Sequence, residues 1–288
     1  MDLSNENIIH VKKEGYEYIQ FRKLLEYENE VKHIIPIGKN LNFRTSSEAN
    51  PVSQENYEKT MRDYDMFAKE IGGERKDIIK SRLNHTANVE RVLKKFNKDK
   101  EDIGPGIYND TDGLVTDKKE VILVSTTADC LTLIFYDTKN KVIANIHSGW
   151  KGTVGRISMN AINKMKEEFD SKPEDIICCM CPSIRKCHFE VKEDVRNIFE
   201  KEFKDIFEQI EEGKINYSKE DIIEEVPETQ SWYIDTVLIN KIMMLNVGLK
   251  EENIIDSKIC TVCNSDIMNS YRAHKKGFGV NTVMIKLV

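Results

Sequence analysis

Short apolar runs alternate with amphipathic and polar stretches along the chain, and this pattern predicts a protein built from strands and helices. The clearest apolar runs are typical of buried strands and lie at 120–126, 131–136 and 142–146. The polar segment 137–141 between the last two predicts a hairpin turn. Shorter strand-like runs are found at 8–11, 18–21, 78–83, 89–93, 176–180 and 280–288.

Helical patterns fill much of the sequence between these runs. Ser53 is expected to cap a helix over 54–71, and the Gly72-Gly73 pair is expected to end it. Apolar residues at helical spacing predict further helices at 154–169, 193–206 and 235–245. The stretch 209–225 is acidic and irregular, and we interpret it as a surface excursion. The mixture of elements favours an α/β or α+β fold class.

Length and charge argue against several classes of protein. The chain has 288 residues, enough for one large domain or two small ones. Its 43 basic and 49 acidic residues give a net charge of −6. A general nucleic-acid binder would instead be strongly basic. No segment approaches the roughly 18–20 apolar residues of a membrane helix, and the first residues lack a secretory signal. We therefore expect a cytoplasmic protein without nucleic-acid or membrane partners.

Three polar residues stand at the ends of predicted strands. Cys130 lies between two apolar runs, His147 follows the next run, and His85 lies between two further strands. Because the ends of neighbouring strands can lie side by side, these side chains can meet. A thiolate and two imidazoles form a good zinc site, and three protein ligands leave a fourth position open, as in catalytic zinc sites.

The same residues also fit interpretations without a metal. The Cys130 thiol beside the His147 imidazole would form the nucleophile–base pair of an amide hydrolase. A single cysteine between apolar strands is also commonly a small buried core residue. Since a metal-bound thiolate is a poor nucleophile, metal content would separate the zinc hypothesis from the hydrolase hypothesis.

The other cysteines form two groups. An odd total of seven, without an export signal, indicates thiols kept for metal binding or chemistry rather than for disulfides. The alternation along 176–181 favours core packing for Cys178 and Cys179. A structural zinc site, a CxxC redox centre and core packing are all open as roles for Cys181, Cys187, Cys260 and Cys263.

The segment 147–152, HSGWKG, forms a glycine-rich corner before the predicted helix 154–169. Its glycine spacing matches neither a Walker loop nor a dinucleotide-binding fingerprint. A helix N-terminus nevertheless offers free N–H groups to an anion. Lys151 and Arg156 add positive charge there.

Segments along the chain resemble the motifs of the YfiH-like, or laccase-domain, family. At 126–157 an ADC tripeptide follows a strand, and HSGWKG, which is similar to the family's HAGW(R/K)G, follows a hairpin. Further segments resemble the family's motifs in the same order, namely LNHTANV at 83–89, TDGLVTD at 111–117, CPSIRKCHFEV at 181–191 and CTVCNSDIMNSYR at 260–272. The resemblance extends from about Leu83 to Arg272.

This resemblance implies a single domain over 1–288, in which two packed mixed β-sheets are flanked by outer helices. It implies a zinc site formed by His85, Cys130 and His147. Copper is an alternative metal, because the family was earlier labelled a multicopper polyphenol oxidase. The implied activity is phosphorolysis of purine nucleosides (adenosine, inosine, guanosine and methylthioadenosine), with adenosine deamination as a second reaction. A purine nucleoside and phosphate are then the expected partners.

The implied reactions give roles to further residues. Cys130, His147 and Asp129 are the catalytic candidates. Phosphate has to be held beside the ribose, and the candidates for anion binding are Lys151, Arg156, Arg185 and Arg272. Trp150 is the candidate for stacking on the base. Deamination needs a carboxylate that carries protons, and Asp129 and Glu190 are the nearest in sequence.

The chain also departs from the family pattern. Residues 33–43 read HIIPIGKNLNF, without the arginine and the glycine pair of the family's N-terminal TRxGGVS segment, so weaker phosphate or base binding is expected. Ser148 replaces a common alanine.

Two other functions compete with the nucleoside hypothesis. Copper-dependent polyphenol oxidation needs several copper sites, which six scattered histidines do not supply. A non-enzymatic interaction module would keep a closed, four-ligand structural zinc site. It would use the acidic stretch 209–225 as its contact surface.

Overall fold

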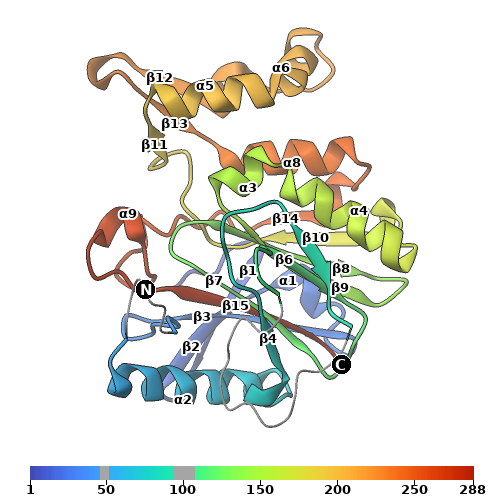
Figure 1. Ribbon diagram of the computed structural model, residues 1–288, viewed down its shortest axis with the longest axis vertical. Coiled ribbons are helices and arrows are strands. Elements are labelled where there is room, and N and C mark those ends of the chain that lie inside the picture. Colours follow the sequence, from blue (N-terminus) through green and yellow to red (C-terminus); the bar gives the residue numbers. More distant parts are fainter. Residues whose placement is uncertain (46–51, 94–107) are drawn as a thin grey trace.

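The computed structural model describes residues 1–45, 52–93 and 108–288, and two stacked six-stranded sheets form its centre (Figure 1). The first sheet has the order β1 (Ile8–Lys13), β2 (Tyr16–Phe21), β3 (Val31–Ile37), β15 (Asn281–Leu287), β7 (Ile122–Thr127) and β4 (Ile78–Lys80). The second has the order β14 (Ile254–Asp256), β10 (Ile176–Met180), β8 (Leu131–Asp137), β9 (Val142–Ser148), β6 (Gly113–Thr116) and β5 (Val89–Arg91). Parallel pairs at β4–β7, β5–β6 and β10–β14 make both sheets mixed, which confirms the predicted fold class.

Apolar side chains fill the space between the two sheets. Ile35 and Leu123 of the first sheet and Ile134 of the second belong to one buried cluster. The alternate residues of β8, Leu133 and Phe135, belong to a second cluster that includes side chains of the covering helices. Because both faces of β8 are covered, the strand is apolar at consecutive positions, as its sequence indicated.

The cysteines of β10 and the residue that follows it are core residues. Cys179 and Cys181 pack between the sheets, and Cys178 packs on the opposite face of the second sheet. None of the three has any solvent exposure. Core packing is therefore confirmed for Cys178 and Cys179, and it is also the role of Cys181.

Helices cover the outer faces of both sheets. On the first sheet lies α2 (Gln54–Glu70), and the Ser53 hydroxyl accepts a hydrogen bond from the backbone N–H of Asn56, which confirms the predicted cap. On the second sheet lie α3 (Trp150–Val154), α4 (Ile157–Phe169) and α8 (Thr236–Asn246). The prediction of one helix over 154–169 is wrong at its start, because Arg156 adopts a left-handed conformation (φ 59°) that separates α3 from α4.

A further layer lies beyond α3 and α8 (Figure 1). It contains β11 (Glu190–Val191), β13 (Ser231–Ile234), β12 (Ile223–Val226), α5 (Glu193–Glu202), α6 (Lys204–Glu211) and α7 (Lys219–Ile222). The predicted helix over 193–206 breaks at Phe203, whose buried ring packs in this layer. The segment 209–225 lies at the surface, as predicted, but it is not irregular, because it includes α7 and buries Ile222 and Ile223.

Two short helices, α1 (Arg22–Leu25) and α9 (Tyr271–His274), complete the α-helices of the described ranges. The helices of the described ranges are too short or too polar to span a lipid bilayer.

The β8–β9 hairpin brings the predicted site residues to one end of the second sheet. Thr132 pairs with His147 across the hairpin, so Cys130, which directly precedes β8, lies near His147. On the other side of β9, the backbone N–H of His147 donates to the carbonyl oxygen of Asp112 at 2.7 Å. Three chain segments therefore meet at this end of the sheet.

Candidate metal centre and adjoining cavity

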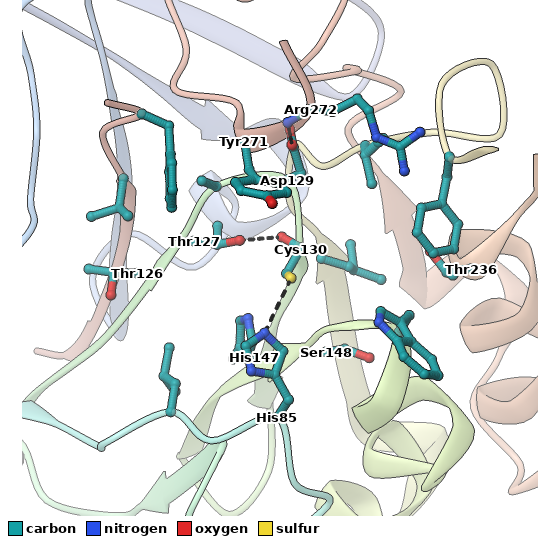
Figure 2. A pocket seen from close by; sticks show the side chains of 18 residues that line it. His85, Thr126, Thr127, Asp129, Cys130, His147, Ser148, Thr236, Tyr271 and Arg272 are labelled. Atoms are coloured by element: carbon teal, nitrogen blue, oxygen red, sulfur yellow. Dashed lines mark hydrogen bonds between the residues drawn. The ribbon is translucent and has the colours of Figure 1, made fainter. Parts of the chain in front are cut away.

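The structure brings His85, Cys130 and His147 together, as the sequence predicted (Figure 2). Their ligand atoms all lie within 4.8 Å of one another. The Cys130 Sγ atom is 4.0 Å from His85 Nε2, and the two imidazole rings are 5.1 Å apart between centroids. These distances suit three ligands that share one cation.

Asp112 holds this cluster in place, and sequence reasoning missed it. One carboxylate oxygen lies 2.9 Å from His147 Nδ1 and accepts the backbone N–H of His85 at 3.0 Å. The other accepts the N–H of Thr86 at 2.8 Å and that of Asn84 at 3.2 Å. An ionised carboxylate only accepts hydrogen bonds, so His147 donates through Nδ1 and presents Nε2 to the cluster. The carboxylate also fixes His85, which has a left-handed backbone (φ 58°).

Electrostatic interactions favour the metal-binding form of the thiol. Burial opposes ionisation of Cys130, but His147 and His85 together lower the pKa of its thiol to about 6. Burial also opposes the charge on His147, but the Cys130 thiolate and Asp112 raise the pKa of the imidazole to about 9. Despite its burial, the hydrogen bonds from His147 and Thr86 hold the pKa of Asp112 at about 2. The two imidazoles therefore favour the thiolate of Cys130, the form that binds metal ions.

The backbone beside the cluster leaves room for its three side chains. A Cβ atom at Gly149 would lie 2.9 Å from His85 Cδ2 and 3.2 Å from Cys130 Sγ. A thiolate and two imidazoles at these separations fit a zinc ion that keeps one position for water or substrate. The same donor types also occur in copper sites. The structure thus supports a metal site whose donor set suits zinc or copper.

A cavity of about 520 Å³ opens beside the cluster (Figure 2). Aromatic side chains form much of its wall, namely Trp150, Phe189, Tyr271 and Phe278. The rings of Tyr271 and Phe278 meet edge to face, with centroids 5.0 Å apart. An apolar cavity of this size with a few polar groups suits a small organic ligand.

Asp129, Trp150 and Arg272 line this cavity. The Asp129 carboxylate accepts hydrogen bonds from the Thr261 hydroxyl at 2.6 Å and from the backbone N–H of Arg272 at 2.7 Å. Its own backbone is left-handed (φ 88°), so the carboxylate stabilises a strained turn next to Cys130. The Arg272 guanidinium donates to the carbonyl oxygens of His188 and Glu190.

The structure does not bring the other predicted cations to the cavity. The lining formed by the described residues leaves out Lys151, Arg156 and Arg185. Arg156 forms an ion pair with Asp205, and both terminal nitrogens of Arg185 donate to Asp256 at 2.6 Å. Arg156 and Arg185 are therefore paired with carboxylates of the protein. Lys151 lies over the Trp150 ring, so none of the three needs a substrate as its partner.

Glu190 lies outside this lining too. Its carboxylate accepts a hydrogen bond from the Ser231 hydroxyl in the outer layer.

Arg44 is a second residue that sequence reasoning missed. The segment 33–43 has no arginine, but the next residue places its guanidinium 4.4 Å from the centroid of the Phe278 ring, which lines the cavity. Arg44 also donates to the carbonyl oxygen of Phe278 at 2.9 Å. The segment 33–43 itself has no arginine, and Arg44 brings a guanidinium next to a ring that lines the cavity.

The chain resembles proteins named for purine nucleoside chemistry. It is 34% identical over 161 residues to a purine nucleoside phosphorylase of Bacteroides thetaiotaomicron, and the match covers 56% of this chain and 55% of the relative. It is 26% identical over 197 residues to adenosine deaminase RL5 from an unknown prokaryotic organism, covering 68% of this chain and 70% of the relative. The first match thus spans about half the length of that relative.

Solved structures share the fold. The Bacillus licheniformis hypothetical protein YfiH has a TM-score of 0.75 and 18% sequence identity, over 94% of this chain and 96% of that one. The family model described as multi-copper polyphenol oxidoreductase laccase matches residues 40–288. The chain therefore belongs to the family described as multi-copper polyphenol oxidoreductase laccase.

Proposed function

We propose that the chain is a zinc-dependent purine nucleoside phosphorylase. The observation that carries the proposal is a three-ligand cluster, His85, Cys130 and His147, that opens onto an aromatic cavity. The names of the relatives support the substrate class. In this proposal His85, Cys130 and His147 hold the zinc ion, and bound zinc acts as a Lewis acid and lowers the pKa of a water ligand.

The cavity wall suits a purine nucleoside in its shape and polarity. The Trp150 and Tyr271 rings line the cavity and supply aromatic surface for a flat base, and Phe189 helps to exclude water. The ribose and the base also need hydrogen-bond partners. The hydroxyls of Thr126 and Thr236 line the same cavity and supply such partners.

Phosphorolysis needs a positive charge that holds phosphate beside the ribose. An oxygen of hydrogenphosphate forms a bond to C1′ while the bond from C1′ to the base nitrogen breaks, and the proton that the phosphate gives up goes to the departing base. In the proposal Arg272 binds the phosphate, because its hydrogen bonds to His188 and Glu190 use only two of its five N–H donors. Arg44 does not line the cavity, but its guanidinium packs on the Phe278 ring, which does, and so adds a second positive charge nearby.

Incubation with inosine and phosphate tests the phosphorylase proposal. The expected products are hypoxanthine and ribose 1-phosphate. Cys130→Ala should abolish their formation, whereas Cys178→Ala, which removes a buried thiol away from the cavity lining, should keep it. A Cys130→Ala protein that stays folded and retains full activity would contradict the proposal.

Adenosine deamination is a second candidate, favoured by the named deaminase among the relatives. Water would add to C6 of the base and ammonia would leave, which requires a group that transfers protons. Asp129 lines the cavity, but both of its oxygens already accept hydrogen bonds. Release of ammonia from adenosine in the absence of phosphate would support this reaction, and Asp129→Asn would then reduce its rate.

Metal content separates the remaining alternatives. A Cys–His hydrolase would work through the Cys130 thiolate in metal-free protein. Copper-dependent phenol oxidation would require copper to be bound, and a non-enzymatic module would show no turnover. Activity measured after chelation, after addition of zinc and after addition of copper distinguishes these outcomes.

A further inference from the structure

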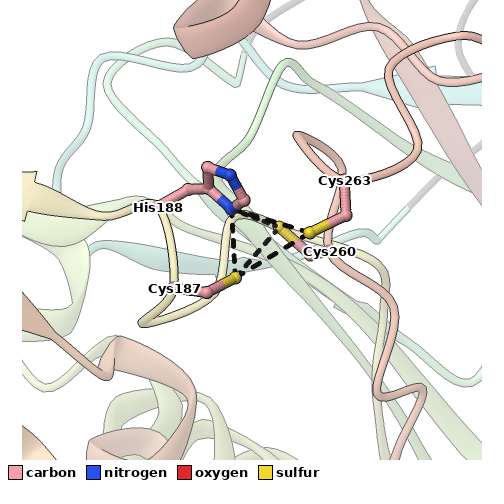
Figure 3. Close-up of side chains that lie close together, drawn as sticks. All are labelled: Cys187, His188, Cys260 and Cys263. Atoms are coloured by element: carbon pink, nitrogen blue, oxygen red, sulfur yellow. Dashed lines mark hydrogen bonds between the residues drawn. The ribbon is translucent and has the colours of Figure 1, made fainter.

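A second cluster of metal-ligand side chains lies outside the cavity lining (Figure 3). It consists of Cys187 and His188, which precede β11, and Cys260 and Cys263, which follow β14. The four ligand atoms all lie within 4.8 Å of one another, although more than 70 residues separate the two pairs along the chain. The fold has therefore brought two loops together at this point.

The distances in this cluster match a tetrahedral zinc site. The Cys187 Sγ atom is 3.7 Å from that of Cys260 and 4.0 Å from that of Cys263. The His188 Nδ1 atom is 3.1, 3.7 and 3.6 Å from the sulfur atoms of Cys187, Cys260 and Cys263. Zinc bonds of about 2.3 Å to sulfur and about 2.0 Å to nitrogen place sulfur atoms about 3.8 Å apart and sulfur and nitrogen about 3.5 Å apart.

Other roles leave part of the cluster unexplained. All three cysteines are free, and the sulfur separations of 3.7 and 4.0 Å are far longer than a disulfide bond of about 2.05 Å. A CxxC redox centre needs only Cys260 and Cys263, so it gives no reason for a third thiol and an imidazole at the same point. A Cys₃His set with all four positions filled is instead typical of structural zinc.

We propose that Cys187, His188, Cys260 and Cys263 bind a second zinc ion, which has a structural role and is distinct from the ion proposed beside the cavity. This site is closed, because four protein ligands fill the tetrahedron and leave no position for a substrate. The ion joins the loop before β11 to the loop after β14.

The second ion would also hold a wall of the cavity. The carbonyl oxygen of His188 accepts a hydrogen bond from the Arg272 guanidinium at 2.9 Å, and the next residue, Phe189, lines the cavity. Thr261, between the two cysteines of the CxxC, donates through its hydroxyl to Asp129 at 2.6 Å. Loss of the ion is therefore expected to loosen Arg272 and Phe189 while His85 and its partner ligands keep their own metal.

Elemental analysis of the purified chain tests this inference. Wild-type protein should contain about two zinc ions per chain. Cys263→Ser changes an exposed ligand and should leave about one, as should Cys130→Ser, and the double variant should contain none. Cys263→Ser should also raise the KM for nucleoside more than it lowers kcat.

Cobalt substitution keeps the inference testable if one variant folds poorly. In a Cys130→Ser protein, cobalt bound by three thiolates should give intense thiolate-to-metal charge-transfer absorption, which Cys187→Ser should weaken. Wild-type protein with a single zinc ion that disappears in Cys130→Ser would overturn the inference, as would another metal in this site. Since the readout is metal content, it remains valid even if no nucleoside activity is found.

Discussion

At the scale of single residues, Asp112 connects the parts of the candidate metal centre. Its carboxylate bonds to the His147 ring and to three backbone N–H groups around His85. A histidine ligand whose second nitrogen donates to a carboxylate is fixed in one orientation and becomes a stronger base. The sequence 111–117 gave no sign of this role, because the partners of Asp112 lie 26 to 35 residues away.

Asp112→Asn should weaken zinc binding about 10- to 100-fold, because the amide no longer orients and polarises His147. Competition with a chelator of known affinity measures this change. Asp117→Asn is a matched control in the same segment, since Asp117 pairs with Lys118 rather than with a metal ligand. Equal zinc affinity in Asp112→Asn and wild-type protein would refute this role.

Gly149→Ala should displace His85, since the added methyl group would lie 2.9 Å from its ring. We expect weaker zinc binding and lower activity, measured by the same competition and by nucleoside turnover. Gly15→Ala serves as the comparison, because space is open around Gly15 and its positive φ of 87° predicts only a loss of about 1 kcal/mol in stability. The prediction fails if both variants bind zinc equally well.

At the scale of elements, the β8–β9 hairpin could be predicted because its strands are continuously apolar and its turn is polar. The meeting of Cys130 and His147 followed from that hairpin alone. Strand β3 escaped prediction, since Pro36 argues against a strand. Pro36 is tolerated there because β15 pairs only with Val31 to Ile34 of β3.

The helix boundaries depended on tertiary contacts that no periodicity reveals. Arg156 turns the chain between α3 and α4, and its guanidinium is held by Asp205 and packs over the Phe203 ring in the outer layer. The buried ring of Phe203 likewise marks the break between α5 and α6. These contacts join segments about 50 residues apart, so the sequence pattern predicted single helices.

His33 on β3 predicts a loss of stability at acid pH. Its Nε2 atom accepts the backbone N–H of Phe21 at 2.7 Å, and complete burial lowers its pKa from 6.5 to about 3. The unfolded chain therefore binds a proton below about pH 6.5 that the folded chain rejects, which costs about 1.4 kcal/mol of stability per pH unit. The stability that neutral His33 provides is fully present above pH 6.5 and is lost as the pH falls towards 3.

Urea denaturation at about pH 7 and about pH 5 measures this effect. Between these two pH values the free energy of unfolding of wild-type protein should fall by about 2 kcal/mol more than that of His33→Gln. The glutamine keeps a hydrogen-bond acceptor but does not titrate. The same pH dependence in both proteins would show that His33 does not titrate in this way.

At the scale of the whole molecule, the cavity collects residues from distant layers. Trp150 comes from α3 and packs on Phe199 of the outer layer, Phe189 precedes β11, and Tyr271 and Arg272 come from α9. Segments 83–85, 126–131, 147–150, 184–189 and 271–272 of the lining were visible as motifs, whereas Thr236, Phe278 and Val280 were not. The arrangement of all of them around one space depends on the packing of all layers. This is why Trp150 and Arg272 line the cavity whereas Arg156 and Arg185, of the same residue type as Arg272, do not.

Arg272→Ala should raise the KM for phosphate about tenfold or more, because it removes charge-assisted hydrogen bonds to the anion. Arg156→Ala should change this KM by less than about twofold, since Arg156 forms an exposed ion pair with Asp205. Initial rates at varied phosphate concentration test both. A larger effect from Arg156→Ala would place the phosphate at the start of α3 and α4 instead.

The most direct test of the central claim is inosine phosphorolysis by wild-type protein before metal removal, after removal and after zinc is returned, with His85→Ala beside it. We predict that activity disappears with the metal, returns with zinc in wild-type protein and does not return in His85→Ala. Full phosphorolysis by metal-free protein, or by folded His85→Ala, would contradict the claim that His85, Cys130 and His147 hold the ion on which catalysis depends.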